Sequence, residues 1–495
     1  MSNENSLADD AFPGARVSST DPRYPTLVRG FNQRFVGTPR YVQLCGSAEQ
    51  VRQAVREALD AGGRITVRGG GHCYENFVSG NRGGVIIDLS PLNRVGRTEG
   101  DGLFYVEGGC TLWDVYSQFY KEYGVTIPGG SCATVGAGGH VVGGGYGLLS
   151  RKHGLTVDYL HRIELVHVNA AGAVEIRTLD RDSRDADEQD MFWAHLGGGG
   201  GNFGVLTKYW FKDPPPAPSW AELASIAWEW DEVNREAFTQ LVTNYGNFLA
   251  QNSAPDSPYK DLFALLHLTQ KAAGQIVLTV QSVSGRERLL EDFLNAVEPR
   301  GVTRVRQRVP VGFHHVALNT AQVRRMPWLE ATQTLNGTGP NQRGKYKSAY
   351  MLKPFPERQI EVMWEHLTAP DFQNPQALLQ VDSYGCEING VAPAATAVPQ
   401  RSSVMKLQYQ TYWTEEREDE ANLSWIRNFY EAMYGPRGPY PDETFDGCYV
   451  NYPDVDLSNW QYLYYKENYP RLRRAKAKCD PLNVFNHQQS IEPPC

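Results

Sequence analysis

The sequence predicts an α+β fold with two domains, and three observations lead to this prediction. The chain has 495 residues, which is long for one hydrophobic core and favours two domains. The first two hundred residues mix short strand and helix patterns with clusters of glycine, whereas the middle of the chain has longer amphipathic patterns and fewer glycines. Three prolines at residues 214–216 separate the two regions, and such a run is typical of a stiff, extended connector.

The first predicted helix follows Ser47 and covers "SAEQVRQAVREALDAGG". Ser47 and Gln50 have the spacing of a capping box. The apolar stripe of this helix consists of Val51, Ala54, Val55 and Leu59. We predict strands in "RITVRGGG", "GVIIDLS" and "LFYVEGG", because β-branched and aromatic residues there run into glycine turns.

A second helix is predicted in "TLWDVYSQFYKEYG", with Thr111 and Asp114 at its start. The segment "HRIELVHVNAAGAVEIRTL" predicts a hairpin that turns at residues 169–172. Beyond the prolines, "NREAFTQLVTNYGNFLAQN" and "PERQIEVMWEHL" have the pattern of amphipathic helices, and "GQIVLTVQSV" and "VMKLQYQTYW" alternate as strands do. These patterns predict an α+β substrate domain in the middle of the chain.

The last stretch, from "CYVNYPDVDL" to "DPLNVFNHQQSI", returns to short strand and turn signals. If "CYVNYPD" is a strand, Tyr449 and Asn451 share one face and Tyr452 lies on the other. A basic cluster of Arg471, Arg473, Arg474, Lys476 and Lys478 has nearly helical spacing. We interpret it as the solvated face of a helix.

Composition excludes several classes of function. The net charge is -8 and the pI about 5.8, which argues against nucleic-acid binding. No apolar run is long enough for a membrane span, and the N-terminus lacks the apolar core of a signal peptide. We therefore expect a cytoplasmic protein, or a secreted one if a signal was removed. The eight cysteines have no CxxC spacing, so a zinc site is not predicted.

Glycine gathers in three clusters, at residues 69–71, in "PGGSCATVGAGGHVVGGGYGLLS" and in "LGGGGGNFGVLT". Glycine lets backbone N–H groups approach a phosphate or a ring edge closely. Three such clusters therefore suggest a dinucleotide. Gly199, Gly201 and Gly204 satisfy GxGxxG, but a helical pattern precedes them and no acidic residue follows at the expected place, which disfavours a Rossmann NAD site. No GxxxxGK[ST] motif is present.

Five separated motifs resemble those of the berberine-bridge-enzyme-like FAD oxidases of the vanillyl-alcohol-oxidase superfamily. They are "VRGGGHCYENF", "PGGSCATVGAGGHVVGGGYGLLSRKHGL", "DMFWAHLGGGGGNFGVLTKY", "YVNYPD" and "CDPLNVFNHQQSI". "DSYGCEINGVAPAATA" and "YYKENYPRLRRAKAKCDP" resemble the branch of bacterial sugar and antibiotic oxidases. The resemblance implies a two-part FAD-binding domain around a substrate domain whose antiparallel sheet is covered by helices. We expect the FAD-binding parts at residues 1–212 and 441–495, and the substrate domain at residues 213–440.

The resemblance also implies two covalent bonds to FAD. His72 matches the histidine linked to the 8α-methyl carbon, and Cys132 matches the cysteine linked to C6. A cysteine needs thiolate character for this reaction, so we expect a lowered pKa at Cys132. Cys73 matches no linkage position, and we expect it to be a buried small residue. His140 is expected beside the flavin, with no metal role. The further residues expected at FAD are Arg68, Gly69, Gly70, Gly71, Gly130, Ser131, Val135, Gly136, Gly138, Gly143, Gly144, Gly147, Val205 and Asn451.

The chemistry that the resemblance implies is hydride removal from a carbon bearing a hydroxyl, with reoxidation by O2 to H2O2. Tyr449 matches the family tyrosine near the flavin and is favoured over Tyr452 as the base, although a free tyrosine has a pKa of about 10. Tyr146 and Tyr384 match active-site tyrosines of the antibiotic-oxidase branch, with simple packing as the alternative. Gln408 stands where berberine bridge enzyme has a glutamate base, which argues against alkaloid ring closure.

The expected substrate is a small molecule with a hydroxyl, on a sugar or a glycosylated natural product. A dehydrogenase that uses another acceptor remains an alternative, as does a ring-forming oxidative enzyme. Two more distant alternatives are a cysteine hydrolase that uses Cys132 and a flavin-containing binding protein without catalysis. No nucleic-acid or membrane partner is expected, and the protein is expected to be a monomer or homodimer.

Overall fold

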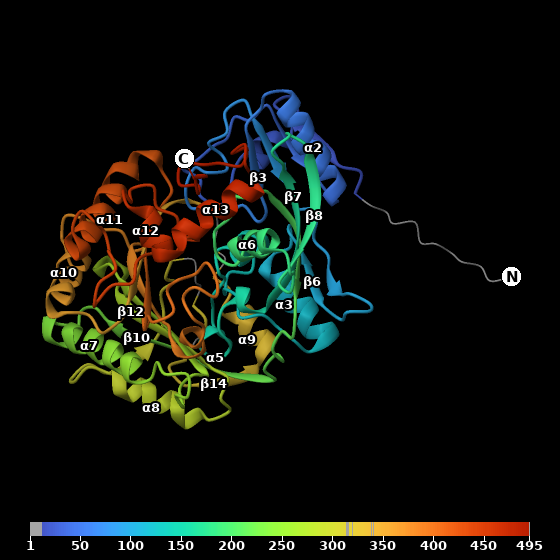
Figure 1. Ribbon diagram of the computed structural model, residues 1–495. Helices are drawn as coiled ribbons and strands as arrows, with labels where there is room; N and C mark the ends of the chain where they lie inside the picture. The colour runs from blue at the N-terminus through green and yellow to red at the C-terminus, as the bar shows by residue number, and fades with distance from the viewer. Residues whose placement is uncertain (1–11, 313–315, 319, 338, 340, 495) are drawn as a thin grey trace.

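The computed structural model describes residues 12–312, 316–318, 320–337, 339 and 341–494. Residues 1–11 lie outside the described part. They include the start of the N-terminal stretch for which we expect no signal peptide. Among the described residues the strands form three sheets, of four, five and eight strands. Figure 1 shows the two smaller sheets, marked by β3 and by β7 and β8, beside the larger sheet that carries β10 and β12.

The four-stranded sheet has the order β1-β2-β4-β3, and its inner three strands are parallel. Its strands are β1 (Ala15–Ser18), β2 (Tyr41–Leu44), β3 (Ile65–Arg68) and β4 (Val85–Asp88). Helix α2 (Ala48–Asp60) begins as predicted, because the Ser47 hydroxyl accepts a hydrogen bond from the Gln50 backbone N–H at 3.2 Å. The Gln50 side chain instead accepts from the Gly46 N–H, one residue earlier than in a capping box.

The five-stranded antiparallel sheet has the order β5-β6-β9-β7-β8. Its strands are β5 (Val95–Arg97), β6 (Phe104–Glu107), β7 (Leu160–Val168), β8 (Val174–Asp180) and β9 (Val205–Phe211). The predicted hairpin is confirmed, because β7 and β8 pair from Arg162 with Asp180 to Val168 with Val174. Helix α3 (Leu112–Gln118) starts with a complete capping box between Thr111 and Asp114, as the sequence predicts.

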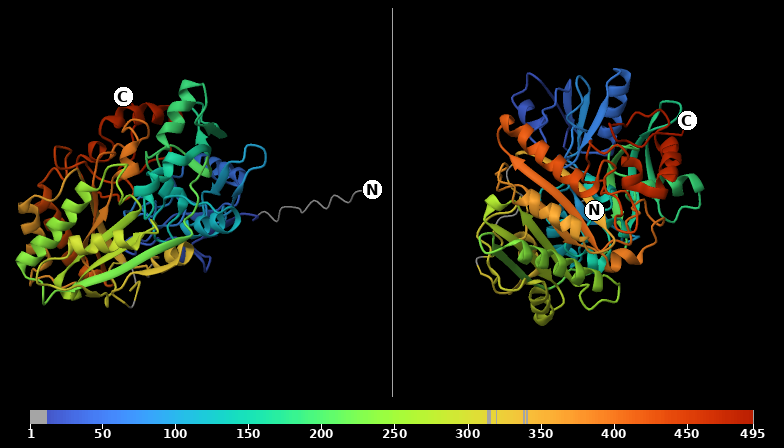
Figure 2. Two further views of the ribbon diagram at one scale, coloured as in Figure 1. Left: turned by 90° about the horizontal axis from the view of Figure 1, so that it is seen from below. Right: turned by 90° about the vertical axis from the view of Figure 1, so that its left-hand side faces the viewer.

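The eight-stranded antiparallel sheet has the order β13-β10-β12-β11-β16-β17-β15, with β14 also paired to β10. Its strands are β10 (Trp220–Glu229), β11 (Leu262–Thr269), β12 (Gln275–Ser282), β13 (Val305–Arg306), β14 (Arg324–Pro327), β15 (Arg343–Met351), β16 (Leu378–Ser383) and β17 (Met405–Trp413). One face packs against helices, seen on the outer side in Figures 1 and 2. These helices are α7 (Arg235–Gln251), α8 (Glu287–Val297), α10 (Glu357–Leu367) and α11 (Asp419–Tyr434). The predicted antiparallel sheet covered by helices is therefore confirmed.

Strand alternation places different residues on the two faces of this sheet. On β17, Leu407 and Tyr409 lie on the helix-covered face, where Tyr409 contacts Phe429 and Tyr430 of α11. Their neighbours Lys406, Gln408, Gln410 and Tyr412 lie on the opposite face. That opposite face is turned toward the two smaller sheets.

The remaining helices are short apart from α6 and α13. They are α1 (Tyr24–Leu27), α4 (Ala137–Val142), α5 (Ser150–His153), α6 (Ala186–Ala194), α9 (Trp328–Thr334), α12 (Trp460–Tyr465) and α13 (Tyr469–Cys479). The C-terminal α13 packs on α6 of the N-terminal part. The prediction of a fully solvated basic face on α13 is wrong for Lys476, which is buried because its ammonium donates to Asp480 and to two backbone carbonyls.

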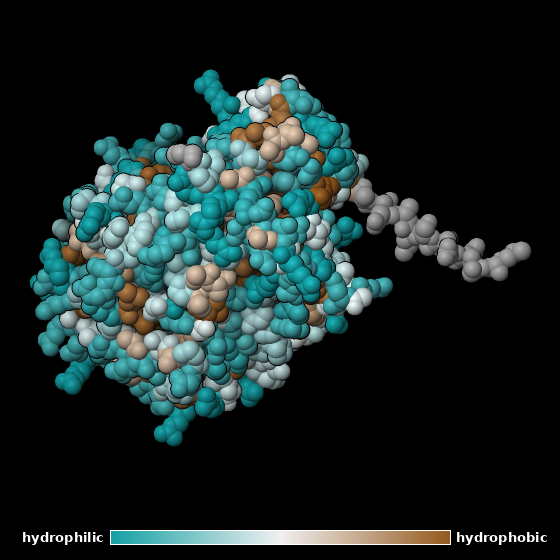
Figure 3. Space-filling view, viewed as in Figure 1, coloured by the Kyte–Doolittle hydropathy of each residue, from teal (hydrophilic) through white to brown (hydrophobic). Residues whose placement is uncertain are grey.

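The face in Figure 3 is mostly hydrophilic, with scattered hydrophobic residues. In the described part of the chain, the large hydrophobic side chains that are exposed are Val36, Trp220, Val316 and Leu482. No helix among those residues combines the length and the apolar character needed to cross a membrane.

Candidate active site

A cavity of about 360 Å³ lies where the three sheets meet. Its wall draws on three separate parts of the chain. The N-terminal part contributes residues 65–78, 130–148 and 195–209 in part, the middle contributes Phe263, Leu265, Gln380, Gln408, Gln410 and Tyr412, and the C-terminal part contributes residues 449–453 and 485–489 in part. Segments far apart in sequence therefore form one site.

Most residues expected at the cofactor lie on this wall. They include His72, Cys132, Arg68, Gly69, Gly70, Gly71, Gly130, Ser131, Val135, Gly136, Gly138, His140, Gly147 and Asn451. Gly143, Gly144 and Val205 do not line the cavity. Val205 is buried in the core on β9, and a Cβ at Gly143 would lie 2.0 Å from the Asn451 amide oxygen. Gly143 thus makes room for Asn451 rather than for a ligand.

Other residues on the wall were not in the predicted set. Gly199, Gly200, Gly201 and Asn202 belong to the third glycine cluster, and His487 belongs to the C-terminal motif. Both signals were visible in the sequence. Cys73, expected to be a buried small residue, is half-buried and also lines the cavity.

Two glycines show why backbone without side chains is needed here. A Cβ on Gly70 would lie 2.3 Å from the backbone nitrogen of Gly136, and a Cβ on Gly136 would lie 2.2 Å from that of Gly70. These two loops therefore touch backbone to backbone. A Cβ on Gly139 would meet nothing within 4 Å, and because Gly139 lines the cavity, a side chain there would project into open space. One glycine pair joins the two loops, and Gly139 keeps the cavity open.

Three side chains on the cavity wall, His72, Cys132 and His140, have shifted pKa values. Burial lowers the pKa of His72 to about 4, so its imidazole is neutral near pH 7, and its Nε2 lies 2.9 Å from the Thr134 hydroxyl. Burial raises the pKa of Cys132 to about 11, so the expectation of a lowered pKa is wrong for the protein without a ligand. Burial also lowers the pKa of His140 to about 4. Its Nε2 accepts a hydrogen bond from the Gly130 N–H at 3.2 Å.

A lysine with no hydrogen bond lies at the centre of the tyrosines. The Lys406 ammonium is fully buried and has no hydrogen-bond partner among the described residues. It lies 3.6 Å from the ring centre of Tyr146, 3.8 Å from that of Tyr452 and 4.5 Å from that of Tyr449. Burial lowers the pKa of Lys406 well below its usual value, and the nearby Asp382 partly offsets this. In its protonated form the ammonium makes cation–π contacts with these rings in place of hydrogen bonds.

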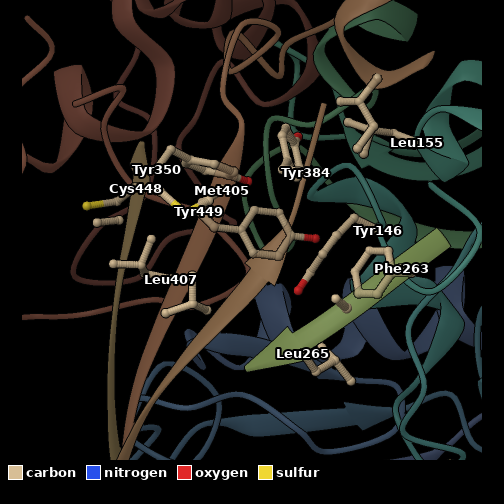
Figure 4. Close-up of a cluster of buried hydrophobic side chains, with 14 of the residues drawn as sticks. Tyr146, Leu155, Phe263, Leu265, Tyr350, Tyr384, Met405, Leu407, Cys448 and Tyr449 are labelled. Atoms are coloured by element: carbon tan, nitrogen blue, oxygen red, sulfur yellow. The ribbon is translucent and has the colours of Figure 1, made fainter. Parts of the chain in front are cut away.

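Tyr146 donates a short hydrogen bond to the buried Asp382 carboxylate. The Tyr449 hydroxyl instead accepts from the Asn451 amide at 3.0 Å, and burial raises the pKa of Tyr449 to about 12. In Figure 4 the hydroxyl ends of Tyr146 and Tyr449 point toward the same space. The predicted tyrosines thus converge, while Lys406 and Asp382 were given no role from the sequence. The only sequence signal for Lys406 was a lysine inside the strand pattern "VMKLQYQTYW".

The segment "CYVNYPD" is a turn and not a strand. The Tyr452 N–H donates to the Tyr449 carbonyl at 3.0 Å, and Pro453 follows with no N–H to extend a ladder. The expectation that Tyr449 and Tyr452 face opposite sides is therefore wrong. Their ring centres are 5.0 Å apart, and both face Lys406.

Tyr384 lies behind this group of tyrosines. It is fully buried, its hydroxyl donates to the Gln400 carbonyl at 3.3 Å, and it is not among the residues that line the cavity. Figure 4 shows it beyond Tyr146 and Tyr449. Its position agrees with the packing alternative.

Three glutamines form a hydrogen-bonded ladder along the sheet. The Gln380 amide donates to Asp382 at 2.8 Å. The Gln410 amide donates to the oxygens of Gln380 and Gln408 at 3.1 and 3.0 Å, and the Gln408 amide donates to the Tyr74 hydroxyl at 3.1 Å. Since an ionised Asp382 only accepts, it orients each amide in turn. The Tyr74 hydroxyl accepts the last hydrogen bond of this ladder, and Tyr74 lines the cavity.

Comparison with known proteins identifies the family. A family model for an FAD binding domain matches residues 39–175, and one described as berberine and berberine like matches residues 448–492. The aclacinomycin-N/aclacinomycin-A oxidase of Streptomyces galilaeus is 40% identical over 98% of this chain and 92% of its own length. The chain belongs to the berberine-bridge-enzyme-like family of FAD-linked oxidases.

Other berberine-bridge-enzyme-like relatives extend this comparison. The hexose oxidase of Chondrus crispus is 38% identical over 95% of this chain and 93% of its own length. The solved structure of a glycopeptide hexose oxidase complexed with teicoplanin has a TM-score of 0.90 and 37% identity, and covers 97% of this chain and 99% of that one. The aclacinomycin oxidoreductase structure has a TM-score of 0.90 and 39% identity, and covers 97% and 100%.

The cavity of this family member fits FAD. The open backbone at Gly139 leaves space for a ring, and the neutral His72 and the Cys132 thiol are among the side chains on the wall. Gly199, Gly200 and Gly201 add further backbone without side chains on the wall, of the kind that accommodates phosphate. The site is therefore that of an FAD-dependent oxidase.

Proposed function

We propose that this protein oxidises a hydroxyl-bearing carbon of a sugar or glycosylated natural product and uses O2 as the final acceptor. When bound, FAD accepts the hydride and passes the electrons to O2, which leaves as H2O2. The observation that carries the proposal is the buried Lys406 beside the Tyr146–Asp382 pair, because Tyr146 lines the same cavity as His72 and Cys132.

The cavity wall supports a neutral, hydroxyl-rich substrate. Strand β17 presents the amides of Gln408 and Gln410 and the hydroxyl of Tyr412, and strand β11 of the same sheet presents the apolar Phe263 and Leu265. Amides and hydroxyls both donate and accept, so they pair with sugar hydroxyls, while an apolar wall suits the C–H face of a ring. The relatives named hexose oxidase and glycopeptide hexose oxidase agree with this substrate class.

We propose Tyr146 as the base that takes the hydroxyl proton. The sequence favours Tyr449, but the contacts favour Tyr146 because its own proton already points at the Asp382 carboxylate. A proton received by the Tyr146 oxygen from the substrate can be matched by transfer of the phenol proton to Asp382. The Lys406 cation over the ring stabilises the negative charge that develops on Tyr146.

We also propose that His72 and Cys132 bond covalently to FAD. The neutral imidazole of His72 has a free lone pair near pH 7, which supports its role as a nucleophile. Because the Cys132 thiol is protonated in the cavity, its proton must leave as the carbon–sulfur bond forms. Each bond to FAD also replaces a C–H bond, and the two electrons released would reduce the flavin and then pass to O2, which would leave as H2O2. The chain divides accordingly into FAD-binding parts at residues 1–212 and 441–495 and a substrate domain at residues 213–440.

Two measurements test the covalent bonds and the acceptor. Acid precipitation is expected to leave the yellow colour in the pellet, and peptide mass mapping is expected to find flavin on both His72 and Cys132. Turnover of a hexose in air is expected to release one H2O2 per substrate oxidised. Colour that stays in the supernatant would contradict the covalent bonds, and turnover that needs an added acceptor would assign the protein as a dehydrogenase.

The base is tested by anaerobic flavin reduction with two variants. Tyr146→Phe is expected to lower the rate constant about 100-fold, the low end for loss of a general base. Tyr449→Phe leaves the Tyr146–Asp382 pair intact and is expected to lower it less than about tenfold. The reverse pattern would assign the base to Tyr449.

A further inference from the structure

The edge strand β15 is the place where both FAD-binding parts of the chain meet the substrate sheet. Asn32 donates to the carbonyls of Tyr74 and Gly344 at 2.8 and 3.0 Å. Toward the other end of β15, the Tyr350 N–H donates to the Gly447 carbonyl at 2.9 Å, and the Tyr449 N–H donates to the Ser348 hydroxyl at 3.0 Å. The open edge of the sheet is thus covered by segments that carry active-site tyrosines.

Residues on β15 alternate between the cavity face and the helix-covered face. Tyr346 lies opposite Gln410 on the cavity face, and its ring stacks on Tyr74 with centres 3.5 Å apart. Lys345 lies opposite Thr411, and Lys347 lies opposite Tyr409, on the face covered by α11. The two lysines therefore lie behind the wall of the active site.

Carboxylates from both FAD-binding parts reach around this edge to the two lysines. The Lys345 ammonium makes a short ion pair with Glu75 and lies 2.7 Å from Asp454. The Lys347 ammonium lies 2.7 Å from Asp454 and 2.9 Å from Asp456. The side chains of Lys345, Glu75 and Asp454 are each no more than 3% exposed.

Every carboxylate in this cluster is ion-paired. Arg427 of α11 pairs with Asp456 at 2.9 Å, so Lys345, Lys347 and Arg427 are paired with Glu75, Asp454 and Asp456, and Arg34 also interacts electrostatically with Glu75. Buried ions are costly unless each is paired. Each anion is therefore held in place by its partner, and so is the backbone to which it belongs.

Those backbones carry the active-site tyrosines. Glu75 directly follows Tyr74 and stands three residues after His72, and Asp454 stands two residues after Tyr452. The rings of Tyr74 and Tyr452 are 5.5 Å apart. On each segment the tyrosine lies on the cavity side of β15 and the carboxylate lies on the other side.

We propose that Lys345 and Lys347 are positioning residues that hold the His72–Glu75 and Tyr449–Asp454 segments against the substrate sheet and so set Tyr74, Tyr452 and His72 in place. The lysines touch neither the cavity nor, on this geometry, any ligand in it. The proposal rests on the proposed function for the roles of those three residues. A displacement of about 1 Å at a reacting group can lower a rate about 100-fold.

The test separates positioning from simple stability. Lys345→Met leaves Glu75 and Asp454 buried with one cation fewer, and this variant is expected to be unstable. Lys345→Met/Glu75→Gln removes one charge of each sign and is expected to melt closer to the wild type. If Lys345 positions the segment, we expect the double variant to lose flavin linkage even though it folds. Fewer than half of its chains are expected to have flavin linked to His72. Its flavin is also reduced by D-glucose, the probe, at least about tenfold more slowly.

Two further variants serve as controls. Arg343 lies on the same strand and the same face as Lys345 but pairs with Asp419 of α11. Arg343→Met is therefore expected to lower the melting temperature. Its flavin linkage and its rate of flavin reduction are expected to stay within twofold of the wild type. Lys345→Arg keeps the cation and is expected to recover most of the linkage. A Lys345→Met/Glu75→Gln variant with linkage and rate both within threefold of the wild type would overturn the proposal.

The wild type separates this proposal from the proposed function. A wild-type protein without flavin on His72 contradicts the covalent bond itself, and one that no hexose reduces contradicts the proposed substrate. The linkage measurement needs no substrate. A loss of linkage in the double variant alone therefore reports on positioning.

Discussion

Removal of the Lys406 charge tests the proposed mechanism most directly. Lys406→Met keeps an unbranched side chain of similar length and removes the ammonium. In the wild type that ammonium is fully buried, has no hydrogen-bond partner among the described residues, and lies 3.6 Å from the ring centre of Tyr146. Water cannot take its place in screening the tyrosine.

The size of the effect follows from these distances. The ammonium lies 3.6 to 4.5 Å from three ring centres. Two unit charges about 4 Å apart attract by about 4 kcal/mol at an effective dielectric constant of about 20. If Lys406 is protonated and a tyrosine becomes negative in the transition state, loss of this attraction slows the reaction about 1000-fold, since each 1.36 kcal/mol is about tenfold.

The assay is anaerobic stopped-flow reduction of the flavin at saturating hexose, which isolates this step from reoxidation. We expect a rate constant about 1000-fold below that of the wild type. Lys353→Met, which removes an exposed lysine of the same domain, is expected to stay within twofold. A Lys406→Met rate within threefold of the wild type would refute the reasoning, because it would mean that Lys406 is neutral or that no tyrosine gains negative charge.

Three other predictions concern the loops, the ladder and the pH dependence. Gly70→Ala places a Cβ 2.3 Å from the Gly136 nitrogen. We expect this variant to have a lower melting temperature and a lower flavin content by absorbance. The control Gly390→Ala, whose Cβ has its nearest contact at 3.9 Å, is expected to change neither. Gln410→Leu leaves the side-chain oxygens of Gln380 and Gln408 without their hydrogen-bond donor. We expect kcat/KM for a hexose to fall about tenfold or more. An unchanged kcat/KM would exclude the glutamine ladder from substrate binding. Burial lowers the pKa of His195 from 6.5 to about 4. Between pH 4 and pH 6.5 the unfolded chain therefore binds more protons than the folded protein. The free energy of unfolding is expected to fall as the pH drops through this range. Denaturant unfolding at several pH values checks this, and His195→Gln should flatten the slope.

Much of this protein can be predicted from local sequence, because local signals report local structure. The capping residues Ser47 and Thr111, the hairpin at residues 160–180 and the alternating strand at residues 405–413 all appear as predicted. The motifs around His72 and Cys132 indicate the family and the cavity that both residues line. The turn at Tyr449 differs from the predicted strand, because a short run before a proline is compatible with both structures.

Short motifs along the chain are enough to predict the family, the order of the elements and the place of His72 and Cys132 in one site, and the structure puts both residues on one cavity wall. What surrounds these residues depends on how distant segments fold together. Tyr146 and Asp382 are 236 positions apart, and Glu75 and Lys345 are 270 positions apart. No spacing along the chain indicates such pairs. A lysine inside a strand becomes a cation among tyrosine rings, or a buried ion-pair partner, only because the fold removes water from it and brings its partners from distant segments.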